Sequence, residues 1–487
     1  MWCVTTMPSI RDGGLKASQA VLGGEWNPTA QRRRLRSTHR QSRGRALLLS
    51  VGCLSVIVGI TRAADSVAST PASSHPAWLT LASLGVTESY DNNVFLSGVE
   101  QRFMPAGFTT LKDKGSWVTT VSPRIRLNLA PFLEDPQSIP VLSLGYAPDI
   151  VVYHNQDSES HQTHRVAAGI AIRDDFLSFN LDDEFAYIHG SRFGPNYPGT
   201  LLNAYATATV RERREQLQDR AKVSLRYDRQ TWFARAAASL LYYDLRTALR
   251  PSTPEEGYQN YSDRYDVNGG LDLGWKISPE VGLTLGYRYG HQFQQQFYWD
   301  PNSTPSDYQR LLFGIEARAA KWLKFDLQVG PDFRSYPADT PSHVTPVKNH
   351  HPVKFYGEAG LSAEISPEDT LTFKFRQFQW VSSLGRIPAL DSYYDLNYRR
   401  KLTDRFSLDL GARLLNSDYT SSSLPSGVRN DWMYTVTASL HGAIAARLSA
   451  DLGYSADLGR NAQDGIANPD TRGFLRHVIS AGLQINF

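Results

Sequence analysis

The stretch FLRHVISAGLQINF, at residues 474–487, ends the chain. Counting back in twos from Phe487 gives an apolar set broken only by His477, while the residues between them, from Asn486 back to Ser480, are polar or small. A period of two with one apolar face predicts a β-strand with one wet side. The stretch alone leaves two architectures open, a soluble β-sandwich and a sheet that closes on this strand.

The same alternation recurs along the chain in about eighteen runs. They centre on residues 78–90, 116–130, 141–153, 163–173, 176–188, 215–227, 231–244, 261–277, 281–294, 308–319, 323–336, 353–365, 370–380, 391–402, 406–417, 430–443, 447–458 and 474–487. After the leader, no segment approaches eighteen consecutive apolar residues, so helical spanning of a membrane is excluded. Strands cross lipid only as a closed sheet, because every backbone group must be paired within the protein.

The connectors alternate between short and long. Short turns are expected at 174–175, 278–280 and 403–405, while 190–204 and 337–352 are long and rich in turn-forming residues. Short periplasmic turns and long outer loops are typical of outer-membrane barrels. A soluble sandwich has no reason to keep this asymmetry through nine hairpins. The sequence therefore predicts an all-β fold, a transmembrane antiparallel up-and-down barrel of about 18 strands (16–18).

The basic residues of the chain are concentrated at its start. The protein has 51 Lys and Arg residues and 48 Asp and Glu residues. Residues 1–63 contain ten of the basic residues and two of the acidic ones. The remainder thus has 41 basic and 46 acidic residues, a net charge of −5, and no nucleic-acid partner is expected. Three arginines precede the short apolar run Ala46–Ile60, and small residues follow it, which predicts a secretory signal peptide.

These features divide the chain into three parts. Residues 1–63 are expected to be a signal peptide with an extended basic N-terminal region, 64–77 a short tether, and 78–487 the outer-membrane β-barrel domain. Both cysteines, Cys3 and Cys53, lie in the leader, so the mature chain is expected to contain neither disulfides nor Cys–metal sites. We expect Sec-type export and insertion into the outer membrane of a Gram-negative (diderm) bacterium.

Aromatic residues make up 11% of the chain, and many fall where a run meets a long connector. An interfacial girdle places aromatics there. The expected girdle residues are Tyr242, Tyr243, Tyr258, Tyr261, Tyr287, Tyr289, Tyr298, Trp299, Tyr336, Trp380, Tyr393, Tyr394 and Trp432.

Two stretches near the start, LGVTESYDNNVFL at 84–96 and WVTTVSPRIRLNL at 117–129, resemble the opening of an outer-membrane β-barrel porin family often encoded beside exopolysaccharide genes. The resemblance implies a barrel and a porin-like role. The final strand also resembles the closing strand of bacterial outer-membrane barrels, whose terminal Phe the barrel assembly machinery reads, which implies an assembly signal at Phe487. Pro123 cannot donate to a strand ladder, so a bulge is expected there.

If the apolar set faces lipid, the alternate set faces the lumen. The expected lumen-lining residues are Arg124, Arg126, Asp182, Glu184, Arg220, Lys222, Arg226, Arg288, Arg310, Lys374, Arg376 and Arg399. The same alternation adds Asp266, Asp272, Glu316, Arg318, Lys324, Asp326, Lys354, Glu358, Asp395, Asp409 and Arg413. Two interpretations remain open, a charged constriction and a solvated wall of cross-strand ion pairs.

Chemical sites are weakly indicated. Some barrels carry a Ser/His hydrolase site on the rim, which needs a nucleophile beside an oriented base. His154, His161 and His164 cluster near an outer loop, but their spacing matches no catalytic pattern and only a weak metal site. We therefore expect no enzyme activity, no catalytic residue, no metal and no cofactor.

The predicted function is passive diffusion of small hydrophilic solutes, including saccharides or exopolysaccharide-linked cargo, through a water-filled lumen. Outer-membrane lipids and the barrel assembly machinery are the other expected partners, and the oligomeric state is left open. The alternatives are a non-conducting adhesion or scaffold barrel and a lipid hydrolase. A long outer loop, such as 100–115 or 337–352, could close the pore.

Overall fold

The computed structural model describes residues 76–94, 96, 114–132, 141–190, 215–246, 263–295, 304–337, 350–381, 388–419, 429–463 and 473–487. These residues all belong to one unit, Val51–Phe487. The expected signal peptide and nearly all of the expected tether lie outside the described residues, as does most of each of the two loops considered for pore closure. Among the described residues, no helix has the length and apolar character needed to cross a membrane.

Strands make up most of the described chain. They are β1 (Leu79–Asp91), β2 (Ser116–Asn128), β3 (Val141–Tyr146), β4 (Asp149–Tyr153), β5 (His161–Arg173), β6 (Leu177–His189), β7 (Gln216–Asp228), β8 (Trp232–Asp244), β9 (Arg264–Ser278), β10 (Val281–Gln294), β11 (Ser306–Ala320), β12 (Leu323–Ser335), β13 (Val353–Glu364), β14 (Asp369–Val381), β15 (Pro388–Lys401), β16 (Phe406–Tyr419), β17 (Arg429–Ala445), β18 (Leu448–Gln463) and β19 (Phe474–Asn486). Two 3₁₀ turns, η2 (Ala130–Phe132) and η3 (Asp157–Glu159), complete the described elements.

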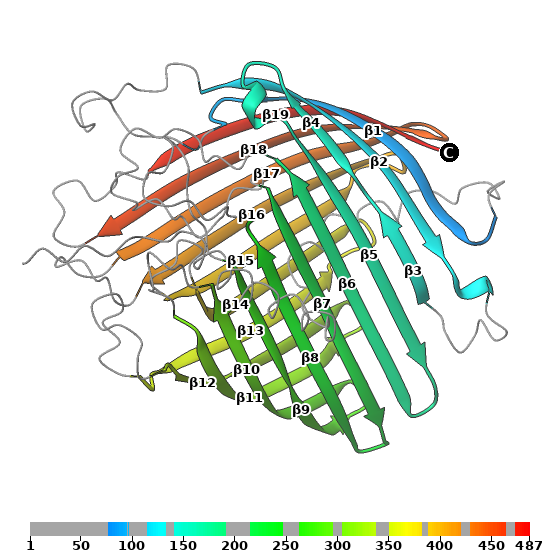
Figure 1. The fold of residues 1–487 in the computed structure, drawn as a ribbon. Helices are drawn as coiled ribbons and strands as arrows, with labels where there is room; N and C mark the ends of the chain where they lie inside the picture. The colour runs from blue at the N-terminus through cyan, green and yellow to red at the C-terminus, as the bar shows by residue number, and fades with distance from the viewer. Residues whose placement is uncertain are drawn as a thin grey trace, which may run out of the picture. The chain divides into compact units, whose positions relative to one another are not determined.

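These strands form one antiparallel sheet in which chain neighbours pair in order and β1 pairs with β19 (Figure 1). Because the first and last strands pair, the sheet is closed. β3 and β4 both lie between β2 and β5 and continue one another, so the nineteen strands make eighteen rows. The prediction of an antiparallel up-and-down barrel of about eighteen strands is confirmed.

Pro123 does not make the expected bulge. The pairing of β1 with β2 runs without a shift through Leu84 and Pro123, and the irregularity lies at Leu79–Leu81. On its other side, β2 pairs with β4 up to Val121 and with β3 only from Ile125. Pro123 therefore lies opposite the break between β3 and β4, where no ladder hydrogen bond is required of its nitrogen.

The two faces of the sheet differ in chemistry. Residues directly opposite each other in the ladders share a face, so one face can be followed around the barrel. The outward face carries a belt of exposed large apolar side chains. The belt includes Leu84, Val86, Trp117, Ile125, Val166, Phe185, Leu225, Trp232, Leu271, Leu273, Leu283, Leu285, Phe313, Phe333, Phe355, Leu396, Leu410, Val436, Leu452, Ile479 and Leu483.

The closing seam joins the two ends of the barrel. The Asp91 carboxylate, which is almost fully buried, accepts hydrogen bonds from Nε and Nη2 of Arg476 at 3.1 and 2.8 Å. The side-chain amide of Asn93 donates to the carbonyl of Leu475, and the backbone nitrogen of Phe487 donates to a carbonyl of β1 at 2.9 Å. The terminal strand thus closes the sheet along its whole length.

Candidate functional site

The lumen face is identified by contacts between strands that are not neighbours. Nη1 of Arg226 on β7 lies 2.8 Å from the Glu316 carboxylate on β11, and Nη1 of Arg235 on β8 lies 2.6 Å from the same group. Such a bond can only cross the interior of a closed sheet.

The pairing registers extend the lumen face from these strands to all the others, because directly opposed residues share a face. All twelve predicted lumen-lining residues lie on the lumen face: Arg124, Arg126, Asp182, Glu184, Arg220, Lys222, Arg226, Arg288, Arg310, Lys374, Arg376 and Arg399. Whether they line a conducting path stays a prediction.

The barrel has two distinguishable ends. Short described turns at 174–176, 229–231 and 279–280 join strands at one end, which we call the short-turn end. At the other end, the long-loop end, the links that follow β6, β8, β10, β12, β14, β16 and β18 lie largely outside the described residues. The positions of the short turns agree with the sequence prediction to within a residue or two.

One side of the lumen is filled by side chains of β8 to β14, which we call the filled sector. Near the short-turn end, the buried Asp272 carboxylate accepts hydrogen bonds from Arg235 and Arg288. Arg235 and Arg226 both reach Glu316. The two carboxylates and two guanidinium groups on β8 to β11 balance one another in charge. Arg226 of β7, which also pairs with Asp228 at 2.8 Å, joins them across the interior.

Two glycines allow neighbouring strands of this sector to approach closely. A Cβ at Gly270 would collide with the carbonyl oxygen of Tyr287 on β10, and one at Gly330 would collide with that of Leu311 on β11. Only glycine permits so close an approach of neighbouring backbones.

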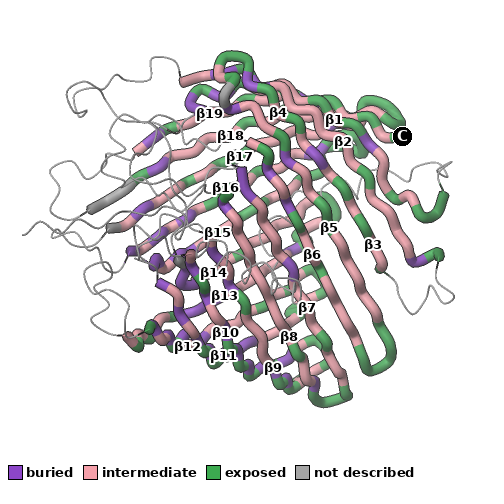
Figure 2. Tube along the Cα trace, in the orientation of Figure 1, coloured by how far each residue is buried: buried purple, intermediate pink, exposed green. Residues whose placement is uncertain are grey.

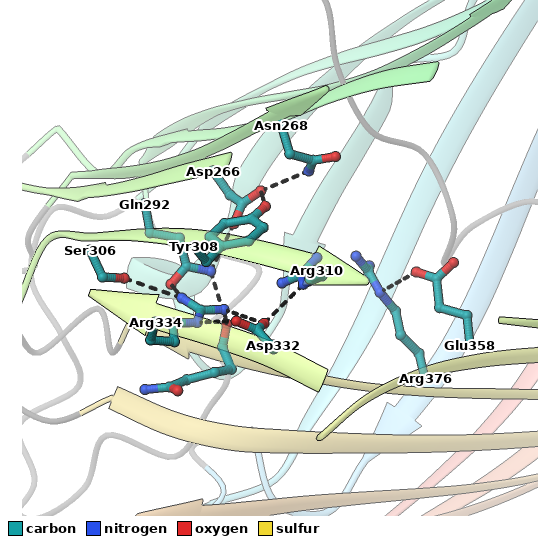
Figure 3. Close-up of polar contacts among 11 residues, drawn as sticks. Asp266, Asn268, Gln292, Ser306, Tyr308, Arg310, Asp332, Arg334, Glu358 and Arg376 are labelled. Atoms are coloured by element: carbon teal, nitrogen blue, oxygen red, sulfur yellow. Dashed lines mark hydrogen bonds and ion pairs between the residues drawn. The ribbon is translucent and has the colours of Figure 1, made fainter. Parts of the chain in front are cut away.

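A second buried network lies in the filled sector toward the long-loop end (Figure 3). Asp332 on β12 accepts hydrogen bonds from Nε of Arg310 at 2.9 Å and from Nε and Nη2 of Arg334 at 2.9 and 3.0 Å. Arg334 also donates to the Gln292 side chain at 2.6 Å. The Tyr308 hydroxyl on β11 donates to Asp266 at 2.8 Å. Every member is buried, which Figure 2 shows as buried positions gathered around β10 to β14.

The outer part of the β14–β15 hairpin leans into this sector. β14 pairs with β13 only as far as Gln377, opposite Gly357, whereas its pairing with β15 continues to Val381. The carbonyl of Gln379 accepts hydrogen bonds from Gln292 on β10 at 2.9 Å and from Arg334 on β12 at 3.1 Å.

An apolar cluster covers the same hairpin. Phe378 and Trp380 are 8% and 7% exposed and pack with Leu312 of β11 and Tyr356 of β13. Side chains of β8 and β15 lie against this cluster, with the ring centroids of Tyr243 and Trp380 6.5 Å apart. Strands β8 and β14 are far apart in the sheet, so the cluster crosses the lumen.

This cluster corrects part of the predicted aromatic girdle. Tyr243, Tyr336, Trp380 and Tyr393 are inside the barrel, whereas Tyr287 and Tyr289 are outward and exposed as expected. Counting in twos from Lys374 through Arg376 reaches Phe378 and Trp380, so the alternation already placed these aromatics on the lumen face. Position at a strand end was the wrong guide.

The rest of the lumen wall runs from β15 through β19 and from β1 to β6. Over the half nearer the short turns, its inward side chains are more exposed than the buried ones of the filled sector. Its charges are paired along the wall rather than across the lumen. Arg399 contacts Asp409 at 2.6 Å, and Arg413, whose side chain is 45% exposed, contacts Asp395 at 2.8 Å. We call this part the open sector. It is the part of the described wall that can be hydrated.

Nine of the twelve predicted lumen residues divide between the two sectors, and the other three, Arg220, Lys222 and Arg226, lie on β7 between them. Arg288 and Arg310 are buried in ion pairs of the filled sector, and Arg376 on β14 pairs there with Glu358 at 2.9 Å. Arg124 and Arg126 lie on β2 in the open sector, half-exposed. Charge alternation alone could not separate these groups, because both lie on the same face of the sheet.

The enzyme alternative has one local candidate on the outward face. Oγ1 of Thr119 lies 2.8 Å from Nε2 of His154 and donates to Glu88 at 2.5 Å. An activated nucleophile requires the carboxylate to orient the second imidazole nitrogen. Here Glu88 bonds the hydroxyl and lies 3.7 Å from the same Nε2. This arrangement does not build a catalytic triad.

The histidine cluster considered as a metal site does not assemble. His154 contacts Thr119, His164 stacks between Tyr146 and Tyr187, and His161 contacts the Glu159 carbonyl. Within the described part of the chain, no group of three or more His, Cys, Asp or Glu residues is placed to hold a metal ion.

No protein-family model matches the chain, and no curated protein matches it. Among solved structures, the chain is similar to the outer membrane protein OpdK from Pseudomonas aeruginosa, at 10% identity and a TM-score of 0.39, over 83% of this chain and 98% of that one. It is also similar to OccK2 (OpdF) of the same organism, in complex with glucuronate, at 10% identity and a TM-score of 0.40, over 84% of this chain and 98% of that one. A third similar structure is the siderophore receptor PirA from Acinetobacter baumannii, at 10% identity and a TM-score of 0.39, over 84% of this chain and 81% of that one.

Likenesses at this identity and TM-score assign neither a family nor a substrate to this chain. Membership of the porin family expected from the sequence therefore stays a prediction. The closed sheet and its apolar outward belt are the form in which strands cross the outer membrane of Gram-negative bacteria. On that ground the chain is an outer-membrane β-barrel protein.

Proposed function

We propose that this protein is an outer-membrane channel through which small hydrophilic solutes diffuse passively along the open sector. The observation that carries the proposal is the contrast between the two sectors. In the filled sector, the pairs Arg288–Asp272 and Arg310–Asp332 are buried, whereas in the open sector the pairs Arg399–Asp409 and Arg413–Asp395 remain partly exposed toward the interior. Eighteen strands enclose more volume than inward side chains can occupy.

The wall residues of the open sector have defined tasks in this function. Pairs such as Arg399–Asp409 and Arg413–Asp395 hold neighbouring charges in place and present a hydrated surface of nearly balanced charge. Arg124 and Arg126 add fixed positive charge near the short-turn end of β2. Fixed charge in a narrow hydrated lumen enriches the opposite ion, so a mild preference for anions is expected.

We extend the proposal to saccharides, including cargo linked to exopolysaccharide export or uptake. The support is the resemblance of residues 84–96 and 117–129 to a porin family often encoded beside exopolysaccharide genes, together with the hydroxyl- and charge-bearing open sector. Liposome swelling with neutral sugars of increasing size tests this extension. Swelling with mono- and disaccharides supports it, and swelling with salts or amino acids alone contradicts it.

Planar-bilayer conductance of the purified protein is the primary test. Stable open steps support the channel. A sealed barrel that hydrolyses lipid esters in a parallel assay would favour a hydrolase, and a sealed inert barrel would favour a surface scaffold or adhesion protein. Insertion must be verified in each sample by heat-modifiable gel migration, so that a missing current is not caused by unfolded protein.

A further inference from the structure

The β14–β15 hairpin has two places where its outer part can be held. In the structure, β13 continues to pair with β12 from Gly357 to Val353, but β14 has left it after Gln377. The outer end of β13 therefore lacks a ladder partner on its β14 side among the described residues. Unpaired strand edges are unfavourable at a barrel wall, which makes this edge a ready acceptor for the segment that left it.

We propose that Phe378–Val381, with the paired start of β15, is a gate that moves between the lumen and the barrel wall. This proposal rests on the channel function proposed above. Extending the register beyond Gly357 and Gln377 by one residue at a time pairs Tyr356 with Phe378 and Lys354 with Trp380. In that wall position the hairpin backbone leaves the filled sector, and the lumen widens toward the long-loop end.

The lumen position is held by identifiable contacts. The Gln379 carbonyl accepts hydrogen bonds from Gln292 and Arg334, and its side-chain amide donates to the Tyr336 hydroxyl. Burial of Phe378 and Trp380 in the cross-lumen cluster adds apolar contact.

The lumen position also has costs. Oε1 of Gln379 is buried and has no hydrogen-bond partner in the described part of the chain. Among the residues that the structure describes, the β13 edge has no ladder partner on its β14 side over the same height. Moving to the wall would exchange three hydrogen bonds at Gln379 for ladder bonds between Val353–Tyr356 and Phe378–Val381. Because each position satisfies groups that the other leaves unsatisfied, the two positions are of comparable stability.

The side-chain alternation is consistent with both positions. Phe378 and Trp380 share the lumen face with Lys374 and Arg376, so they stay inside in the wall position as well. The Gln379 side chain would move from the Tyr336 hydroxyl to the outward side beside Phe355. The gate is thus a movement of backbone, with the aromatic side chains remaining on the lumen face.

A disulfide across the expected wall register tests the gate. The double variant Lys354→Cys/Trp380→Cys places two thiols on directly opposed residues, within the Cα separation that a disulfide requires. The mature chain expected from the sequence has no other cysteine. The matched control is Ser362→Cys/Thr372→Cys, an inward pair on the same two strands that is already opposed in the structure.

Both pairs are expected to form a disulfide under mild oxidation in membranes, read by gel mobility after thiol labelling. Oxidation of the Lys354→Cys/Trp380→Cys protein should raise single-channel conductance at least twofold over its reduced form, while the control pair should show no change. Tyr336→Phe in the first background removes one hydrogen bond of the lumen position and should speed its cross-linking roughly fivefold.

Three results would overturn the proposal or its premise. Cross-linking of the control pair without cross-linking of Lys354→Cys/Trp380→Cys shows that the hairpin does not reach the wall. Cross-linking without a change in conductance shows that the movement is not a gate. Absence of conductance in every protein, wild type included, overturns the channel function, and the disulfide yield then still decides whether the hairpin moves.

Discussion

Replacing Asp332 with Ala is expected to destabilise the barrel by about 3–5 kcal/mol, the typical cost of removing one partner from a buried ion pair. Asp332 is 1% exposed and accepts three hydrogen bonds from Arg310 and Arg334, which are 5% and 2% exposed. Charge-assisted bonds contribute roughly 1.5–3 kcal/mol each. Arg334 keeps its bonds to Gln292 and Ser306, so the expected loss is below the sum of the three.

Urea unfolding of the protein refolded into lipid vesicles, followed by tryptophan fluorescence and by gel mobility, measures this loss. Asp395→Ala is the matched control, because its partner Arg413 is half-exposed and the same substitution should cost only about 0–1 kcal/mol. The triple replacement Asp332→Leu/Arg310→Met/Arg334→Met should recover most of the lost stability, since it removes the buried carboxylate and both of its guanidinium partners together.

Equal losses for Asp332→Ala and Asp395→Ala would refute this reasoning. That outcome would mean that water reaches the two guanidinium groups and screens them, so that the filled sector is hydrated rather than packed. A triple replacement that is less stable than Asp332→Ala would contradict the same reasoning from the other side.

Three further outcomes are expected. Deleting Phe487 should lower the folded amount in the membrane several-fold while inserted protein conducts normally; unchanged folded yield on heat-modifiability gels would contradict an assembly role. Changing Arg124 and Arg126 together to Ala should shift the zero-current potential in a salt gradient toward cation preference, and an unchanged potential would mean that neither lines the narrowest passage. Arg476→Ala should lower the free energy of unfolding by about 2–4 kcal/mol because it leaves the buried Asp91 carboxylate without its guanidinium, and a loss below about 1 kcal/mol in the urea assay would show that this pair does not hold the closing seam.

Much of the fold was predictable because strands obey a strict local period. In the final strand, the alternation from Leu475 to Phe487 assigns each side chain to a face, and the structure keeps that assignment. A run of such strands with no apolar helix has one way to satisfy its backbone in lipid, which is closure. The paired β1 and β19 are the consequence.

The filled and open sectors were not predictable from the sequence. Arg310 and Arg124 both occur on the polar side of an alternating run, yet one is buried in ion pairs and the other is half-exposed. The difference depends on how closely neighbouring backbones approach, as at Gly270 and Gly330, and on which strands face one another across the lumen. Neither quantity is encoded in a period of two.

The gate shows the same limit most clearly. The sequence analysis assigned Trp380 to the interfacial girdle, although alternation from Lys374 and Arg376 reaches Phe378 and Trp380 on the polar side. Neither guide could show that their backbone leaves β13 and lies in the interior. Pairing between neighbouring strands is local and is set by side-chain alternation. Contact between β14 and the distant strands β8, β10 and β12 depends on the three-dimensional curvature of the closed sheet, so only the tertiary structure could decide it.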